Sequence, residues 1–244
     1  MRRLARPALS LRSQRVLEER QKKVDKAPDP RAEAKRLWNI RQNRTFQEIA
    51  TLLTSMASGL SRCMYCEDSE GTAIDHFWPK AVYPNRAFVW DNYLLACSHC
   101  NSNAKRDQFP LDSSGTPLLI DPSVDDPGIH LFLSPSTGIY RELTEKGKHS
   151  KEVFGLNRGV LVQGRIHAWR VAEVLIVDYA HLRRDGRHAD AAKILNTLAD
   201  QPFSGVTLQL RRLARMPGAE NLIRPECLQA LAEFAGDFDA RLPQ

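Results

Sequence analysis

Four cysteines in two pairs constrain this chain more than any other feature. Cys63 and Cys66 form one pair, and Cys97 and Cys100 form the other. A two-residue spacer lets both sulfurs of a pair reach one ion at about 2.3 Å, so the pattern predicts a closed tetrahedral zinc site. Four thiolates leave no coordination position for water, and the zinc is therefore expected to be structural. Any chemistry must come from the residues that the zinc holds together.

Composition favours metal binding over disulfide bonds. The chain has 244 residues and is 42% hydrophobic and 26% charged, which suits one large or two small globular domains. No run of about eighteen apolar residues and no cleavable leader is recognisable, so we expect a cytoplasmic protein without a membrane segment. In a reducing compartment, cysteines at this spacing favour a metal site. The fifth cysteine, Cys227, lies on an apolar helix face and indicates a buried hydrophobic position.

Charge is distributed unevenly along the chain. Residues 1–62 contain 15 Lys and Arg against 6 Asp and Glu, residues 63–126 contain 4 against 10, and residues 127–244 contain 16 against 13. An acidic centre suits a divalent cation, and a basic N-terminal region suits a polyanion such as DNA. The alternative is that the N-terminal charges only solvate helix faces.

Apolar periodicity predicts a mainly α protein with a small zinc-stapled lobe. Three regions are expected, namely a basic helical region at 1–60, the zinc lobe at 61–125 and a mostly helical region at 126–244. Helices are predicted near 10–26, 31–41, 45–58, 160–182, 189–199, 207–215 and 227–238, and extended pieces near 117–122, 130–133 and 138–142. Thr45 and Glu48 are spaced as a capping box that would begin the third helix.

The segment between the cysteine pairs carries residues suited to phosphodiester hydrolysis, which needs a base for water and a cation for the developing charge. His76 is a natural base near pH 7, and Asp75 is a hard oxygen ligand suited to Mg²⁺. Neighbours on a strand point to opposite sides, so a turn or bulge would have to aim both into one site. Asn101 directly follows Cys100, and we expect it at the start of a helix at 101–106, where its amide oxygen can complete the Mg²⁺ ligands.

This arrangement resembles the HNH endonucleases of the ββα-metal type, in the version with four zinc cysteines. The matching residues are the first cysteine pair, Asp75-His76-x-x-Pro79, Trp90-Asp91-Asn92, and Cys97-x-x-Cys100-Asn101 with Lys105 in the following turn. The resemblance implies that His76 is the general base and that Asn92 holds the His76 loop by hydrogen bonds. It also implies that Asp75 and Asn101 bind the catalytic Mg²⁺, for which Mn²⁺ can substitute.

Several positions keep two interpretations. Asn103 is an alternative to Asn101 as the third residue of the HNH signature. Asn92 is either part of the site or only a turn former. Lys105 and Arg106 are either phosphate contacts or solvated charges.

A longer stretch, roughly residues 60–170, is similar to the PtuB family, the HNH effector subunits of Septu and related retron anti-phage systems. The shared residues include Phe77-Trp78-Pro79-Lys80, Tyr83-Pro84, Phe109-Pro110-Leu111-Asp112, Leu119-Ile120-Asp121-Pro122 and Phe154-Gly155-Leu156-Asn157-Arg158. This similarity implies DNA as the substrate and an ABC/SMC-like ATPase subunit of the PtuA kind as the partner. Residues 101–107 depart from the compact family pattern, which leaves the helix register there open.

Three functions follow from these observations. The first is a Mg²⁺-dependent HNH DNA endonuclease that serves as the effector of a two-component ATPase/HNH anti-phage system. The second is a stand-alone restriction or junction-resolving HNH nuclease, although the C-terminal helices show no base-reading motif. The third is a zinc-stabilised DNA-binding module without catalysis, which would have no need of His76 beside Asp75. The helices from Val160 onward would be a docking surface or a bundle that supports the lobe.

Overall fold

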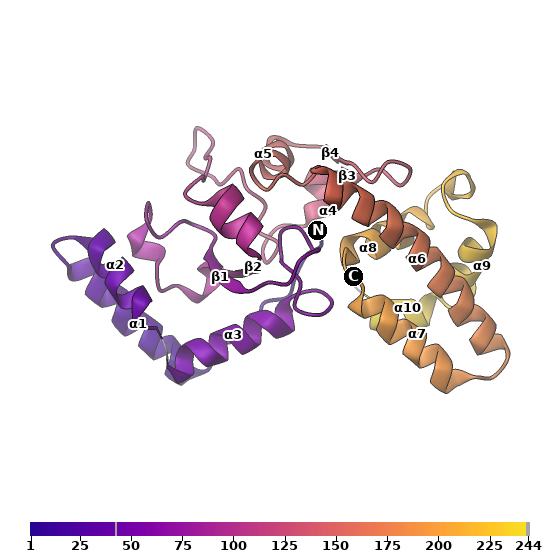
Figure 1. Ribbon diagram of the computed structural model, residues 1–244, viewed down its shortest axis with the longest axis horizontal. Coiled ribbons are helices and arrows are strands. Elements are labelled where there is room, and N and C mark those ends of the chain that lie inside the picture. The colour runs from indigo at the N-terminus through magenta and orange to yellow at the C-terminus, as the bar shows by residue number, and fades with distance from the viewer. Residues whose placement is uncertain (42, 243–244) are drawn as a thin grey trace.

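The structure is a computed structural model that describes residues 1–41 and 43–242. Helices α1–α3 and strands β1 and β2 lie toward one end of the molecule, and helices α6–α10 lie toward the other (Figure 1). The small sheets are antiparallel pairs, β1 with β2 and β3 with β4. The predicted fold class, mainly α with a small ββα lobe, is confirmed. Among the described residues, no helix is both long and apolar enough to cross a membrane.

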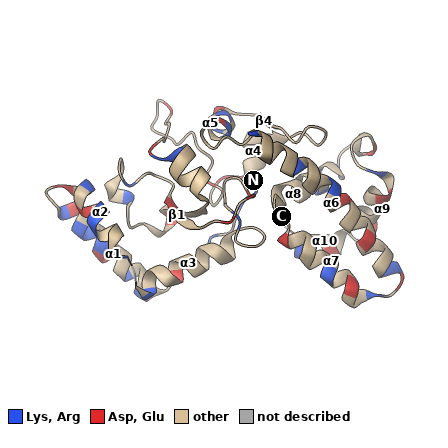
Figure 2. Cartoon of the chain, in the orientation of Figure 1, with Lys and Arg blue, Asp and Glu red and all other residues tan. Residues whose placement is uncertain are grey.

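The N-terminal helices form an arm beside the two-stranded sheet. They are α1 (Leu11–Lys26), α2 (Pro30–Asn39) and α3 (Arg44–Met56). Helix α1 packs on both α2 and α3. Lys and Arg are frequent along α1 and α2, with Asp and Glu interspersed (Figure 2). The predicted helices of this region are therefore present, and they expose a mixed charge pattern.

The predicted capping box at the start of α3 is wrong. The side chain of Asn43 caps this helix, so Thr45 lies inside the first turn. Glu48 bonds another helix instead, because its carboxylate accepts from the Ser10 amide at 2.8 Å and from the Ser13 hydroxyl at 2.6 Å. A tertiary contact between α1 and α3 thus replaces the local hydrogen bond that the spacing suggested.

The first nine residues have no regular secondary structure, and several of them pack against the rest of the protein. Leu4 and Leu9 are buried, and the Leu4 amide donates to the Pro122 carbonyl at 2.7 Å. The Arg6 guanidinium donates to the carbonyl oxygens of Trp90 at 3.1 Å and Tyr93 at 3.0 Å. Part of the positive charge of the N-terminal region therefore has a structural role.

The central lobe consists of β1 (Ala73–His76), β2 (Tyr93–Ala96) and the π-helix η3 (His99–Lys105), with short 3₁₀ turns η1 (Pro84–Arg86) and η2 (Trp90–Asn92) between the strands. Pairing is regular from Ala73 opposite Ala96 to His76 opposite Tyr93, so β1 contains no bulge. The predicted helix at 101–106 is found in a different register. It begins two residues earlier and closes its turns with the wider π spacing.

A second small sheet joins the lobe to the C-terminal helices. It pairs β3 (Leu131–Leu133) with β4 (Tyr140–Glu142), between α4 (Pro127–His130) and α5 (Glu145–Val153). The expected extended pieces at 130–133 and 138–142 form this pair. The piece expected at 117–122 does not form a strand, although Pro117 makes an isolated β-bridge with Leu111. Helix α5 was not predicted.

The C-terminal region is a helical bundle built on one long helix. Its elements are α6 (Gly159–Arg184), α7 (His188–Asp200), α8 (Ser204–Leu213), η4 (Ala219–Asn221), α9 (Pro225–Glu233) and α10 (Ala235–Arg241). Helix α6 packs against α7, α8 and α9. The single helix predicted at 227–238 is divided at Phe234, whose backbone leaves the helical region with φ −113° and ψ 29°.

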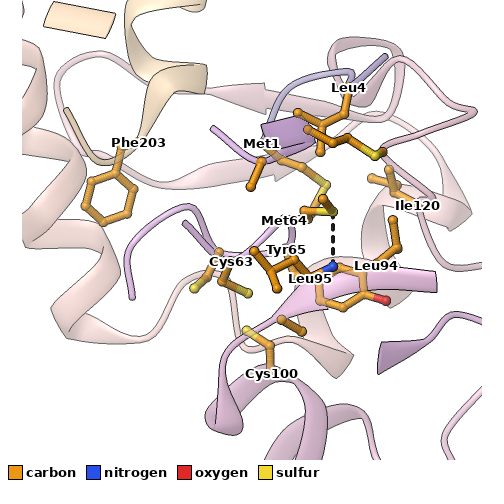
Figure 3. Close-up of a cluster of buried hydrophobic side chains, with 14 of the residues drawn as sticks. Met1, Leu4, Cys63, Met64, Tyr65, Leu94, Leu95, Cys100, Ile120 and Phe203 are labelled. Atoms are coloured by element: carbon orange, nitrogen blue, oxygen red, sulfur yellow. Dashed lines mark hydrogen bonds between the residues drawn. The ribbon is translucent and has the colours of Figure 1, made fainter. Parts of the chain in front are cut away.

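One continuous hydrophobic core connects all three predicted regions. Figure 3 shows part of this core, where side chains from distant parts of the sequence lie close together. The labelled residues include Met1, Leu4, Met64, Tyr65, Leu94, Ile120 and Phe203. The boundaries at 60/61 and 125/126 remain predictions, but the regions that they separate are packed together.

Candidate metal centre and catalytic site

The four paired cysteines converge on one point. All four are buried, and their sulfur atoms lie within 4.8 Å of one another. The sulfurs of Cys66 and Cys97 are 3.9 Å apart, too far for a disulfide bond of about 2.05 Å. A tetrahedron with metal–sulfur bonds of about 2.3 Å has sulfur–sulfur edges of about 3.8 Å, so the cluster fits zinc. The predicted joining of the two pairs is confirmed.

The turn after the first cysteine pair is fixed by the C-terminal helices. Glu67 has φ 59°, a conformation that is uncommon for residues other than glycine. Its carbonyl accepts from the Phe203 amide at 2.9 Å, and its carboxylate accepts from the Ser204 hydroxyl at 3.0 Å and the Gly205 amide at 3.2 Å. These bonds hold the turn in place and attach the cysteine cluster to the start of α8.

A cleft of about 990 Å³ opens beside the cluster, and three of the predicted site residues line it together. Asp75 and His76 come from the end of β1, and Asn101 comes from the first turn of η3. Asn92 is not among the lining residues. The opposite wall comes from the N-terminal helices and the loop between them: Trp38, Arg41, Asn43, Phe46, Gln47 and Ala50. No sequence motif indicated that wall.

His76 is held as a neutral imidazole. Its Nε2 lies 3.0 Å from the carbonyl oxygen of Ala87. A carbonyl can only accept, so Nε2 carries the proton and Nδ1 keeps its lone pair. The Trp38 ring packs against the imidazole at a centroid distance of 4.2 Å. Burial first, and then the charges of Lys80, Lys105 and Arg41, lower the pKa of His76 well below its usual value, which favours the form that can accept a proton near pH 7.

Asp75 lies beside His76 in a different environment. Its Oδ2 accepts from the Tyr65 hydroxyl at 2.6 Å. The Lys105 ammonium donates to Oδ1 at 3.2 Å and lies 3.1 Å from Oδ2. Lys105 is fully buried, so both interpretations of it from the sequence, a solvated charge or a phosphate contact, are wrong. Tyr65 and Lys105 are the partners of Asp75 that the sequence did not reveal.

Asn92 makes the hydrogen bonds that the resemblance implied. Its Oδ1 accepts from the Trp78 amide at 2.7 Å, and its Nδ2 donates to the carbonyls of Trp78 at 3.0 Å and Arg86 at 2.8 Å. Asn92 is buried. It therefore joins the loop after His76 to the turn at η1, and its contribution to the site is to hold that loop.

Asn101 fits the position of a metal ligand better than Asn103 does. The Asn101 amide donates to the Cys97 carbonyl at 3.0 Å, which places its backbone directly on the second cysteine pair. Its side chain is half-buried and lines the cleft with Asp75, whereas Asn103 is exposed and does not line it. Carboxylate and amide oxygens are ligands that Mg²⁺ accepts. The roles of Asp75, His76, Asn92 and Asn101 in catalysis remain predictions.

Three cations line the same cleft. They are Arg41 from the loop after α2, Lys80 from the loop after β1, and Arg106 just after η3. Arg41 and Lys80 lie over the Trp38 ring at 4.8 Å and 5.6 Å. Burial lowers the pKa of Lys80, and the Asp75 carboxylate opposes that effect. Cations around a carboxylate and an imidazole suit a phosphate-containing ligand.

Residues 63–107 match the family model described as HNH endonuclease, and the match contains both cysteine pairs and the Asp75-His76 step. Residues 63–107 are an HNH endonuclease domain. The structure gives this HNH domain the order strand, strand, helix around the cysteine cluster. The predicted resemblance to HNH endonucleases is thereby confirmed.

Two curated relatives extend the similarity beyond the HNH domain. Septu protein PtuB of Bacillus mycoides is 30% identical over 150 residues, covering 49% of this chain and 50% of the relative. Septu protein PtuB of Bacillus thuringiensis is 33% identical over 103 residues, covering 40% of this chain and 37% of the relative. The chain thus spans half or less of the length of these relatives. No solved structure matches.

Proposed function

We propose that this chain is a Mg²⁺-dependent HNH DNA endonuclease that hydrolyses phosphodiester bonds. The proposal depends on one observation: Asp75, His76 and Asn101 line the same cleft, which is also lined by cations. The HNH endonuclease domain supports the same activity. A DNA-binding module without catalysis has no use for a neutral, buried imidazole beside a carboxylate.

In the proposed reaction, His76 is the general base. A water molecule in the cleft transfers its proton to Nδ1 as the water oxygen attacks the phosphorus. The Ala87 carbonyl then stabilises the imidazolium through Nε2–H, 3.0 Å away. Burial keeps the imidazole neutral before the reaction, so the base is ready near pH 7.

Asp75 and Asn101 would hold Mg²⁺ through a carboxylate and an amide oxygen. Asp75 has room for such a bond: Tyr65 and Lys105 occupy three of its acceptor positions, and a carboxylate offers about four. When bound, Mg²⁺ would neutralise charge on the phosphate and on the leaving oxygen. Arg41, Lys80 and Arg106 would bind the DNA phosphates, and Asn92 would hold the loop that carries His76. Zinc at the four cysteines would be structural.

We further propose that the nuclease is the effector of a two-component anti-phage system with an ABC/SMC-like ATPase subunit of the PtuA kind. The similarity to two Septu proteins supports this assignment. Helix α6 supplies a candidate contact face, because Val160, Val171 and Val174 are 65%, 41% and 54% exposed and their spacing places them on one side of the helix. The basic exposed face of α1 is a second candidate.

Plasmid cleavage tests the enzymatic part of the proposal. Zinc-loaded protein should nick or linearise supercoiled DNA in the presence of Mg²⁺. Addition of EDTA should stop this cleavage. Asp75→Ala and Asn101→Ala should lose cleavage, and added Mn²⁺ should restore a fraction. Wild-type protein that binds DNA but never cuts it, alone or with the ATPase, would contradict an endonuclease.

Co-expression tests the partner. If an ATPase of the PtuA kind is encoded beside this gene, the two proteins should elute as one complex in size-exclusion chromatography. Val171→Asp with Val174→Asp should weaken the complex, whereas Lys193→Asp on the exposed face of α7 should not. Two separate peaks for the wild-type proteins at micromolar concentration would contradict a constitutive assembly and would leave the nuclease assignment intact.

A further inference from the structure

Lys105 is a buried cation that the proposed reaction does not use. Its ammonium lies between Oδ1 and Oδ2 of Asp75 and also donates to the His76 carbonyl at 2.6 Å. All three contacts are with two consecutive residues of β1. The side chain is fully buried and does not line the cleft. Its ammonium contacts one side chain of the cleft, the Asp75 carboxylate, and its charge also helps to lower the pKa of His76.

Lys105 changes the charge that the cleft offers to a metal ion. Asp75 and Asp107 are the carboxylates that line the cleft, against the cations Arg41, Lys80 and Arg106. The Lys105 ammonium, which does not line the cleft, already neutralises the charge of the Asp75 carboxylate. A divalent ion at Oδ1 would therefore share its carboxylate with a fixed ammonium in a setting with more positive than negative groups, and like charges repel most strongly where water is excluded.

We propose that Lys105 is a positioning residue that keeps the affinity of this site for free metal ions low and so couples metal binding to DNA binding. A phosphate from bound DNA adds the negative charge and the oxygen ligands that Asp75 and Asn101 alone do not supply. Metal then binds stably only when the substrate is in place. This inference rests on the proposed role of Asp75 as a Mg²⁺ ligand.

Metal affinity without DNA gives the direct test. Zinc-loaded wild-type protein and Lys105→Met are titrated with Mn²⁺ and followed by calorimetry. Loss of the buried ammonium should tighten the Mn²⁺ dissociation constant by about tenfold or more, because the repulsion of the metal disappears. A merely structural role predicts the opposite, since a disordered Asp75 would bind metal more weakly. An unchanged or weaker affinity in Lys105→Met overturns the inference.

Lys148→Met is the matched control. It makes the same Lys-to-Met change on α5, at an exposed position that does not line the cleft, where solvent screens the charge. Its Mn²⁺ affinity should change by less than about threefold. A change as large as that in Lys105→Met would show that overall charge, and not the buried pair with Asp75, sets the affinity, and would overturn the inference.

A second measurement does not depend on the folding of a Lys105 variant. In the His76→Ala background, which keeps DNA intact, Mn²⁺ affinity is measured with and without a saturating DNA duplex. DNA should tighten Mn²⁺ binding by at least about tenfold. Equal affinities overturn the coupling and leave the nuclease assignment standing. No Mn²⁺ binding under either condition, DNA included, overturns the metal role of Asp75 and the inference together.

Discussion

The Ser204 hydroxyl lies 3.0 Å from Glu67 Oε1, and this hydrogen bond joins the turn after Cys66 to the start of α8. The Gly205 amide adds a second bond to the same carboxylate at 3.2 Å. Glu67 is buried. The cysteine cluster therefore supports more than the nuclease lobe, because the first turn of a C-terminal helix is attached to it.

Removing the metal should consequently unfold the lobe and loosen the C-terminal helices together. Four thiols this close cannot all ionise without a cation, and zinc binding supplies folding free energy to small sites of this kind. We expect one zinc per chain by metal analysis, and a lower melting temperature by circular dichroism in Cys63→Ser or after chelation. Cys227→Ala should keep its zinc. A folded, active Cys63→Ser protein, or freshly purified protein without zinc, would contradict a structural zinc site.

Cys227 should be unreactive in the native protein. It is fully buried on α9, and burial first, with the Glu173 carboxylate second, raises the pKa of its thiol to about 12. The thiolate is the reactive form, so labelling by a thiol reagent at pH 8 should be negligible and should rise only toward pH 12 or on unfolding. In denaturant with a chelator, all five cysteines should react. Rapid labelling of one thiol at pH 8 with zinc retained would show that Cys227 is accessible.

Asn92→Ala should destabilise the protein and abolish cleavage. The change removes three hydrogen bonds and leaves the Trp78 amide and two carbonyls unpaired in a buried position. The expected loss is about 2–3 kcal/mol in the free energy of unfolding, measured in urea. Asn85→Ala, at an exposed position of the same segment, should stay within about 0.5 kcal/mol of the wild type. Full activity in Asn92→Ala would show that the loop after His76 keeps its conformation without the hydrogen bonds of Asn92.

The sequence could predict the positions of residues that depend on their near neighbours in the chain. The spacing of the cysteines predicts the cluster, and the position of Asn101 next to Cys100 predicts its place beside it. Helical periodicity predicts the bounds of α6 and α7 closely, because a long apolar stripe along one side of a helix must face the hydrophobic core. These features depend on neighbours in the chain and not on distant contacts.

What the sequence could not show depends on tertiary contacts. Lys105 carries no local signal that it will reach back to Asp75, and Tyr65 lies inside the first cysteine pair without any motif of its own. Trp38 packs on His76 from a helix outside the match to the HNH family model. The same cause explains the failed capping box, since the Glu48 carboxylate bonds Ser10 and Ser13 at the start of α1 and not its own helix end.

The N-terminal charges should add affinity for DNA without sequence preference. Deleting residues 1–26 would remove the buried Leu4 and Leu9, so charge must be changed in place. The exposed cations suited to this are Arg12, Arg15, Lys22 and Lys23. If all four contact phosphates, replacing them with Gln should flatten the slope of log affinity against log salt by roughly 3–4. An unchanged slope with a lost ATPase complex would assign these charges to the partner.

Cleavage of DNA by His76→Ala tests the assignment of the active site. We expect this variant to retain its zinc, its fold and its DNA affinity, while the rate of plasmid cleavage in Mg²⁺ falls by about 10²–10⁴, because only the general base is removed. Zinc content, circular dichroism and a DNA-binding isotherm on the same preparation separate loss of chemistry from loss of structure. Cleavage at the wild-type rate by zinc-loaded His76→Ala would contradict the assignment of the active site.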